Sequence, residues 1–160
     1  MTLEEFNTAD TNVARIALLQ CCGSKHWAEA VLKRRPFPDR DTLLSAADSV
    51  WWTLKREDWL EAFSAHPKIG QKKLSGWSSE EQRGIDSAGA NILERLAQRN
   101  EQYEQRFGWI FLVHATGKNA HELLALLEAR LKNEAEEEFR IAAGEQAKIM
   151  KLRLSKLLTL

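Results

Sequence analysis

Signals that start and stop helices follow one another closely along this chain, and they constrain its fold more than any other feature. Ser24, either Asp39 or Asp41, and Asn119 precede apolar residues at helical spacing, while Gly23 and Gly108 each follow such a segment. Side-chain oxygens accept hydrogen bonds from the free N–H groups at a helix start, and glycine suits the left-handed residue after a helix end. No segment alternates convincingly with period two, and no Asn-Gly or Asp-Gly hairpin turn occurs. The pattern predicts an all-α fold.

The apolar spacing divides the chain into about eight helices in one domain, residues 1–160, with a long C-terminal helix. After a short first helix from Thr2, the expected helices cover residues 11–22, 25–34, 39–54, 58–66, a segment from Ser78, 91–107, 120–133 and 134–158. In the second helix, Val13, Ile16, Leu19 and Gln20 recur at helical spacing. The apolar run 109–113 is the only strand-like segment.

Composition excludes several classes of partner. Lys plus Arg and Asp plus Glu both number 23, so the net charge is zero and the basic excess of a nucleic-acid-binding protein is missing. No apolar run approaches the roughly 20 residues that span a bilayer. The only cysteines, Cys21 and Cys22, are adjacent and are expected to be reduced packing residues, not metal ligands. The acidic start, residues 1–6, lacks a signal-peptide pattern, so we expect a cytoplasmic location.

The pentapeptide His66-Pro67-Lys68-Ile69-Gly70 is the first candidate for chemistry. Proline restricts the backbone of the preceding residue, so the helix before it should end at or before His66. An imidazole on a stiffened helix exit is placed well for proton transfer, because its ordinary pKa of about 6.5 lies near physiological pH. The alternative is a histidine that only terminates the helix and caps its carbonyls.

Two further sites carry polar side chains with two interpretations each. The run Ser78-Ser79-Glu80-Glu81-Gln82 has the form of a capping box, in which Glu81 bonds back to Ser78. The same helix start would also offer N–H groups to an anion or an amide. Arg153 lies beside the apolar face of the last helix, where it either forms a structural ion pair or reaches a cleft.

These pieces occur in an order that resembles the 2-oxo-4-hydroxy-4-carboxy-5-ureidoimidazoline (OHCU) decarboxylase family over almost the whole chain. The motifs that carry the resemblance are Phe6-Asn7, Cys21-Cys22-Gly23-Ser24, Trp27-Ala28, Arg35-Pro36-Phe37, Asp58-Trp59-Leu60, His66-Pro67-Lys68-Ile69-Gly70, Ser78-x-x-Glu81-Gln82, Asn100-x-x-Tyr103-x-x-Arg106-Phe107-Gly108, Phe111-x-x-x-Ala115-x-Gly117-Lys118, Arg130-Leu131-x-Asn133 and Lys148-Ile149-x-x-Leu152-Arg153-Leu154. Each motif alone is weak, but their combined order and spacing is specific.

The resemblance implies an all-helical carboxy-lyase, usually homodimeric, that forms (S)-allantoin from OHCU in urate breakdown without a metal or an organic cofactor. It implies that His66 is the catalytic acid/base and that Glu81 and Arg153 are the other functional polar residues. The residues it implies for the substrate-binding surface are Pro67, Ser78, Ser79, Glu80, Glu81, Gln82, Phe111, Leu112, Val113, His114 and Ala115. His114 stands where the family more often has cysteine or a small apolar residue, and the loop between Gly70 and Trp77 is short for the family.

Three other functions remain open from the sequence. A helical binding module without catalysis would explain the helices and the neutral charge, but it leaves the polar motifs as purely structural. A decarboxylase or hydrolase of another ureido heterocycle would share the motifs, because pocket shape sets such specificity. A helix-turn-helix DNA-binding protein is disfavoured by the charge balance.

Overall fold

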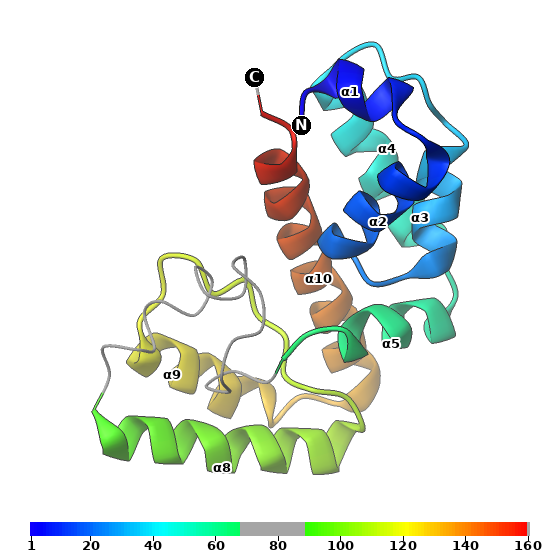
Figure 1. The fold of residues 1–160 in the computed structure, drawn as a ribbon. Coiled ribbons are helices and arrows are strands. Elements are labelled where there is room, and N and C mark those ends of the chain that lie inside the picture. The colour runs from blue at the N-terminus through cyan, green and yellow to red at the C-terminus, as the bar shows by residue number, and fades with distance from the viewer. Residues whose placement is uncertain (68–88, 160) are drawn as a thin grey trace. The chain divides into compact units, whose positions relative to one another are not determined.

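The computed structural model describes residues 1–67 and 89–159, and these form an all-helical structure (Figure 1). The described helices are α1 (Leu3–Thr8), α2 (Thr11–Cys21), α3 (Lys25–Leu32), α4 (Arg40–Thr53), α5 (Arg56–Ser64), α8 (Ala90–Phe107), α9 (Ala120–Arg130) and α10 (Ala135–Leu157). No strand occurs among the described residues, and the run 109–113 is irregular instead of a strand. The all-α prediction is therefore confirmed. The expected helix from Ser78 lies outside the described residues.

The chain divides into two compact units, residues 1–65 with 146–160, and residues 66–145. The long helix α10 contributes to both, because the boundary at residues 145 and 146 falls within it. The first unit contains α1–α5 and the C-terminal part of α10, and the second contains α8, α9 and the N-terminal part of α10.

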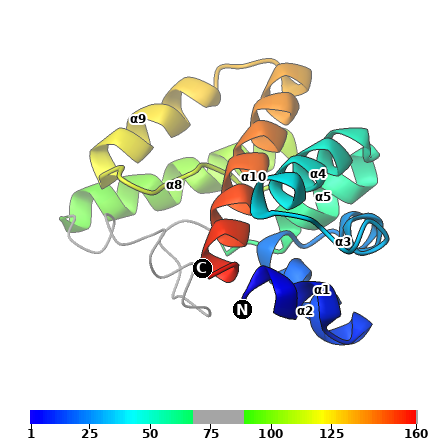
Figure 2. The same ribbon diagram turned by 90° about the horizontal axis from the view of Figure 1, so that it is seen from above.

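In the first unit, α3 packs against α2, α4 and α5 around buried tryptophans. The indole N–H of Trp27 donates to the Ala47 carbonyl at 3.0 Å, so this buried polar group is satisfied. The C-terminal part of α10 is joined to α4 by Lys151 and Asp48, whose charged atoms lie 3.0 Å apart. The two ends of the chain lie together (Figure 2), because the Thr159 N–H donates to the Met1 carbonyl at 2.9 Å.

Three predicted helix starts are confirmed, but the left-handed glycine expected at Gly23 is wrong: α2 ends at an extended Cys22, and among the described glycines only Gly108 and Gly117 have a positive φ. Ser24, Asp39 and Asn119 each accept a hydrogen bond from a first-turn N–H of α3, α4 and α9. Gly108 has a φ of 87° after α8, a left-handed conformation that favours glycine. The predicted start of α5 is wrong by two residues: the helix begins at Arg56, and Asp58 in its first turn accepts from the Lys55 N–H at 3.2 Å.

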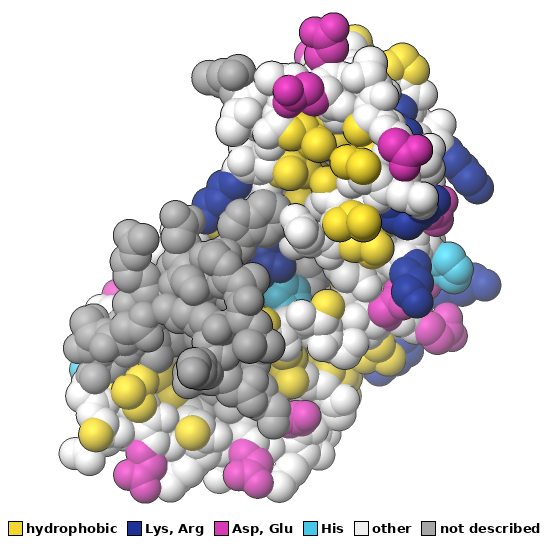
Figure 3. Space-filling view, viewed as in Figure 1, with side chains coloured by type: hydrophobic (Ala, Val, Ile, Leu, Met, Phe, Trp, Pro, Cys, Tyr) yellow, Lys and Arg dark blue, Asp and Glu magenta, His cyan; other side chains and the backbone are white. Residues whose placement is uncertain are grey.

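The buried face of α2 also differs from the apolar spacing in the sequence. Val13 and Ile16 are more than half exposed, while the buried residues are Ala14, Ala17, Leu18 and Cys21. The helix packs against α3, and its buried face carries mostly small side chains while two larger apolar ones lie at the surface. Figure 3 shows hydrophobic side chains gathered on the surface of this unit. None of the described helices has the length and hydropathy to span a membrane.

In the second unit, α8 packs against α9 (Figure 2) around an aromatic cluster. The Tyr103 ring lies 4.7 Å from that of Phe107, and the Trp109 ring lies 5.5 Å from Phe107 and 5.2 Å from Phe139. These centroid distances are in the favourable range for aromatic pairs. The cluster joins the end of α8 to the start of α10, with the irregular segment 109–115 between them in the chain.

Cys21 and Cys22 are both buried and free, as packing residues would be. Burial raises the pKa of the Cys21 thiol to about 12, and the nearby positive charge of Arg153 opposes this only in part. Burial likewise raises the pKa of Cys22 to about 12, against a backbone hydrogen bond to Ser24 and the same charge of Arg153. Both thiols are therefore neutral at physiological pH.

The raised thiol pKa values predict a loss of stability at alkaline pH. Unfolded thiols ionise near pH 8.5, whereas the folded ones do so near pH 12. The free energy of unfolding therefore contains the full contribution of the thiols below about pH 8.5. It falls as pH rises from there toward 12, by about 1 kcal/mol per pH unit for each thiol. Urea unfolding from pH 7.5 to 9.5 should show this slope, and a variant with both Cys21→Ala and Cys22→Ala should lose it. Equal slopes in the two proteins would refute the assignment.

Candidate active site

His66 stands just after α5, where the sequence predicts the helix to end. The helix ends at Ser64, Ala65 is its C-terminal cap, and His66 lies in the bend before Pro67. Both His66 and Pro67 are half-buried. Proline lacks an N–H and disfavours a helical residue before it, so the chain leaves the helix with a stiffened backbone at the imidazole.

A close approach of the α2–α3 turn fixes the end of α5. A Cβ atom added to Gly23 would lie 2.5 Å from the Cβ of Ala65, closer than real Cβ atoms come. The position therefore requires glycine for the space it leaves. Because Ala65 is bonded directly to His66, the turn at Gly23 helps to define where the chain leaves α5 toward the histidine.

Arg153 is a buried residue of α10 in the first unit, only 9% exposed. It lies among apolar residues of the same helix, including Ile149, Met150 and Leu154, which are all buried. Its positive charge acts on both buried cysteines. A guanidinium with five donors in this setting suits a planar acceptor such as a carboxylate or a carbonyl pair.

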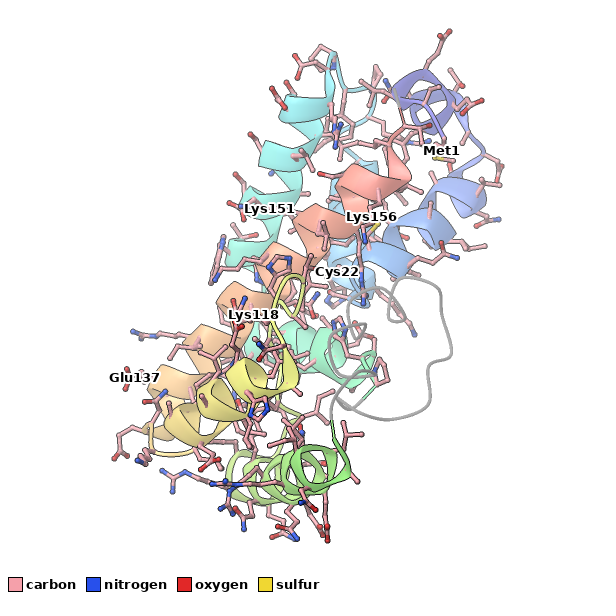
Figure 4. The ribbon with its side chains drawn as sticks, turned by 90° about the vertical axis from the view of Figure 1, so that its left-hand side faces the viewer. Met1, Cys22, Lys118, Glu137, Lys151 and Lys156 are labelled. Carbon is pink, nitrogen blue, oxygen red and sulfur yellow. The ribbon has the colours of Figure 1, made fainter. Side chains whose placement is uncertain are left out.

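The irregular segment 109–115 is buried in the second unit, with Phe111, Leu112, Val113 and Ala115 each less than 10% exposed. Its carbonyls are held from two sides. The Leu112 carbonyl accepts from Nη1 of Arg130 at 2.5 Å, and the His114 carbonyl accepts from Nζ of Lys118 at 2.9 Å (Figure 4 labels Lys118). The His114 N–H donates to Oε1 of Glu145 at 3.4 Å.

Val113 stands between these two held residues. None of the hydrogen bonds among the described residues engages its N–H or its carbonyl, although Val113 is only 6% exposed. Buried backbone groups are nearly always paired, so such groups mark a place where a ligand's amide edge gains a partner at little cost. Peptide N–H and C=O groups complement the alternating donors and acceptors of a ureido or imidazolinone ring.

Arg130 is held in turn by a buried carboxylate. Its Nε lies 2.8 Å and 3.1 Å from the two carboxylate oxygens of Glu138, which is fully buried. The Tyr103 hydroxyl donates to Glu138 at 2.8 Å and accepts from the indole N–H of Trp109 at 3.0 Å. Burial raises the pKa of Tyr103, so its hydroxyl stays protonated and remains a donor.

The structure distributes the predicted residues as follows. His66, Pro67 and the segment 111–115 belong to the second unit, and Arg153 belongs to the first. Residues 78–82, which include Glu81, lie outside the described residues. In the sequence, Arg130 stands out only through the motif Arg130-Leu131-x-Asn133, and Glu138 belongs to the acidic stretch 134–138. Glu138 lies four residues before buried Ala142, and that spacing was the available signal for its burial.

Metal ligands do not gather in the described part of the chain. No group of three or more His, Cys, Asp or Glu side chains there lies close enough to hold an ion. The groups the structure does offer are a half-buried imidazole, a buried guanidinium and the backbone of a buried irregular segment. Each of these groups is of a kind that binds a planar polar molecule or moves a proton.

Comparison with known proteins identifies the class of this all-α fold. The structure superimposes on the crystal structure of OHCU decarboxylase in the presence of (S)-allantoin with a TM-score of 0.80 and 36% identity, over 87% of this chain and 94% of that one. A family model described as OHCU decarboxylase matches residues 7–155. The chain therefore belongs to the OHCU decarboxylase family.

Named relatives agree with this membership. The chain is 36% identical over 146 residues to the uric acid degradation bifunctional protein TTL of Arabidopsis thaliana, of which the match covers only 45%. It is 30% identical over 159 residues to a 2-oxo-4-hydroxy-4-carboxy-5-ureidoimidazoline decarboxylase of Haloferax volcanii, of which the match covers 95%. The chain thus spans less than half of the plant protein and nearly all of the archaeal one.

The close approach at Gly23 predicts that Gly23→Ala destabilises the protein. The new methyl group must push against the Cβ of Ala65, and overpacking of this kind costs about 1–3 kcal/mol. Gly144→Ala is the matched control, because nothing lies within 4 Å of an added Cβ there and alanine is the better helix former. Urea unfolding should show a loss of stability in the first variant only. Equal stability of Gly23→Ala and the unsubstituted protein would show that α5 ends without this constraint.

Proposed function

We propose that this protein decarboxylates OHCU and forms (S)-allantoin in urate breakdown. The observation that carries the proposal is that one family model spans residues 7–155, which includes parts of both compact units. For the same reason we propose that residues 1–160 act as a single functional domain. Assignment of the site residues follows the family resemblance and the local geometry described above.

The reaction needs an electron sink, and the substrate supplies one. The leaving carboxylate sits on a ring carbon that also bears a hydroxyl and that adjoins a ring C=N bond. When the bond to the carboxylate breaks and CO₂ leaves, its electron pair forms a double bond to the neighbouring carbon, and the former imine nitrogen takes a proton. The enol that results loses its hydroxyl proton, and the ring carbon that bears the ureido group gains a proton. Delivery of that proton to one face gives (S)-allantoin.

In this proposal, His66 moves the proton between the hydroxyl and the ureido carbon. Its place at the stiffened helix exit before Pro67 supports the role, because a positioned imidazole works as acid and base near neutral pH. Arg153 holds the carboxylate or a ring carbonyl through its planar donors. Glu81 orients His66 or accepts from the ureido N–H groups, and residues 78–82 bind the amide edges of the ring.

The segment 111–115 contributes its backbone to the substrate. The Phe111 ring packs edge-to-face on Tyr103 at 5.3 Å, and the Arg130 guanidinium lies 4.5 Å from its centroid. We therefore assign substrate contact to the backbone of this segment, Val113 above all. The Phe111 ring instead holds the segment in place through its packing on Tyr103 and Arg130. His114 contributes through its backbone, whose carbonyl and N–H are already held by Lys118 and Glu145.

The proposal extends to setting and assembly. Two buried reduced cysteines are compatible with a reducing, cytoplasmic compartment. A homodimer follows from the family resemblance alone, and light scattering on the purified protein decides it. No metal or organic cofactor is part of the proposal, because the substrate's own C=N bond accepts the electron pair.

His66→Ala tests the acid/base assignment. The variant should remain folded and bind (S)-allantoin, but its enzymatic rate should fall about 10²–10⁴-fold, the usual contribution of general acid–base catalysis. Circular dichroism on freshly made OHCU is the measurement, because the substrate also decomposes unaided and only the enzyme gives one enantiomer. His121→Ala, at an exposed position on α9, is the matched control and should keep full activity.

Two outcomes would contradict this account. Near-normal turnover in His66→Ala would remove the histidine from the chemistry. Racemic allantoin at the spontaneous rate from the unsubstituted protein would refute the decarboxylase function and leave the other ureido heterocycles or a binding module.

A further inference from the structure

We propose that Arg130 and Glu138 are positioning residues for the reaction, because together they fix the backbone of the segment 111–115. The inference rests on the proposed function for the statement that this segment contacts the substrate. Neither residue is expected to touch the reacting atoms. Arg130 acts through the Leu112 carbonyl, and Glu138 acts through Arg130.

The pair is costly to bury, and its geometry shows how the cost is offset. Glu138 is fully buried and Arg130 is 7% exposed. The two are joined by contacts of 2.8 Å and 3.1 Å from Nε to the two carboxylate oxygens. The carboxylate also receives the Tyr103 hydroxyl at 2.8 Å and the Asn133 side-chain amide at 3.4 Å. The carboxylate is thus well satisfied, whereas Nη2 of Arg130 is buried without a hydrogen-bond partner among the described residues. A buried charge pair of this kind is weak evidence for a gain in stability.

The network is joined to the segment 109–115 by two hydrogen bonds. At one end, the Trp109 indole donates to the Tyr103 hydroxyl at 3.0 Å. Three residues later, the Leu112 carbonyl accepts from Nη1 of Arg130 at 2.5 Å. Tyr103 and Arg130 both hydrogen-bond to Glu138, so one carboxylate positions both side chains that hold the segment. Residues 109–112 cannot move without breaking one of these two buried hydrogen bonds, of which the one from Arg130 is charge-assisted.

The hydrogen bonds to this segment also determine which of its backbone groups are left to bind a ligand. Arg130 takes the Leu112 carbonyl and Lys118 takes the His114 carbonyl, two residues further on. Val113 lies between them, and its N–H and carbonyl, like those of Phe111 one residue before Leu112, form no hydrogen bond with any described residue. A binding site of this kind needs its groups held to within a fraction of an ångström. The hydrogen bonds from Arg130 and Lys118, one on each side of Val113, provide this. The motif Arg130-Leu131-x-Asn133, which the proposed mechanism leaves unused, supplies three hydrogen bonds to Glu138, two from Arg130 and one from Asn133.

The test is Arg130→Lys, which keeps the positive charge beside Glu138 but loses the planar fork that reaches Leu112. We expect KM for OHCU and Kd for (S)-allantoin each to rise about tenfold with kcat within about twofold, the pattern of lost ground-state binding. Amide hydrogen exchange of residues 111–115 should become faster, while exchange in α2 and α3 stays unchanged. Arg95→Lys is the matched control, because Arg95 pairs with Glu128 at the exposed surface of the same unit, and it should change none of these quantities.

A second variant guards against misfolding. Arg130→Met with Glu138→Gln removes both charges at similar volume and leaves no unpaired ion, so it should fold and show the same rise in KM and the same faster exchange. Unchanged KM in folded Arg130→Lys, or failure of both variants to fold, would show a purely structural role and overturn the inference. Amide exchange needs no substrate, so an inactive unsubstituted protein would refute the proposed function separately, whereas normal activity with unchanged exchange and KM would refute the positioning role alone.

Discussion

The buried ion pair of Arg130 and Glu138 is the interaction that links the helices of the second unit to its irregular segment. It joins the end of α9 to the first turn of α10, and through Tyr103 it reaches α8. It also satisfies a carbonyl of the irregular segment 109–115, which has no regular secondary structure to pair its backbone. A segment of this kind stays buried only if side chains take over the hydrogen bonds that a helix would supply. The pair therefore allows a helical protein to bury a segment that has no regular secondary structure.

Helix positions followed from the sequence because the signals that end helices are local. A cap residue, a glycine or a proline acts on N–H and C=O groups within one turn, so Ser24, Asp39, Asn119 and Pro67 fixed their boundaries without knowledge of the rest of the fold. The buried face of α2 did not follow, because Val13 and Ile16 look like core residues by size alone. Their exposure depends on which face of α2 the neighbouring helices cover, and that is a tertiary effect.

The candidate site divides in the same way. His66 is positioned by a local signal, and the structure places it at the helix exit that the proline dictates. The role of Glu138 could not be read locally, because three other glutamates surround it in the sequence and only its partners, Arg130 and Tyr103, distinguish it. These partners lie 8 and 35 residues away. Roles for Glu81, Arg153 and the backbone of 111–115 stay predictions from the family resemblance and the chemistry.

A crystal structure of this protein with (S)-allantoin would test the central claim most directly, namely that a clamped backbone segment binds the ring. The account predicts that the ureido or ring amide groups hydrogen-bond to the backbone of residues 111–115, with the bond from Arg130 to the Leu112 carbonyl intact. It also predicts that the segment keeps its position when the ligand is absent. A ligand bound away from this segment, or a segment that rearranges and releases Arg130 on binding, would contradict it.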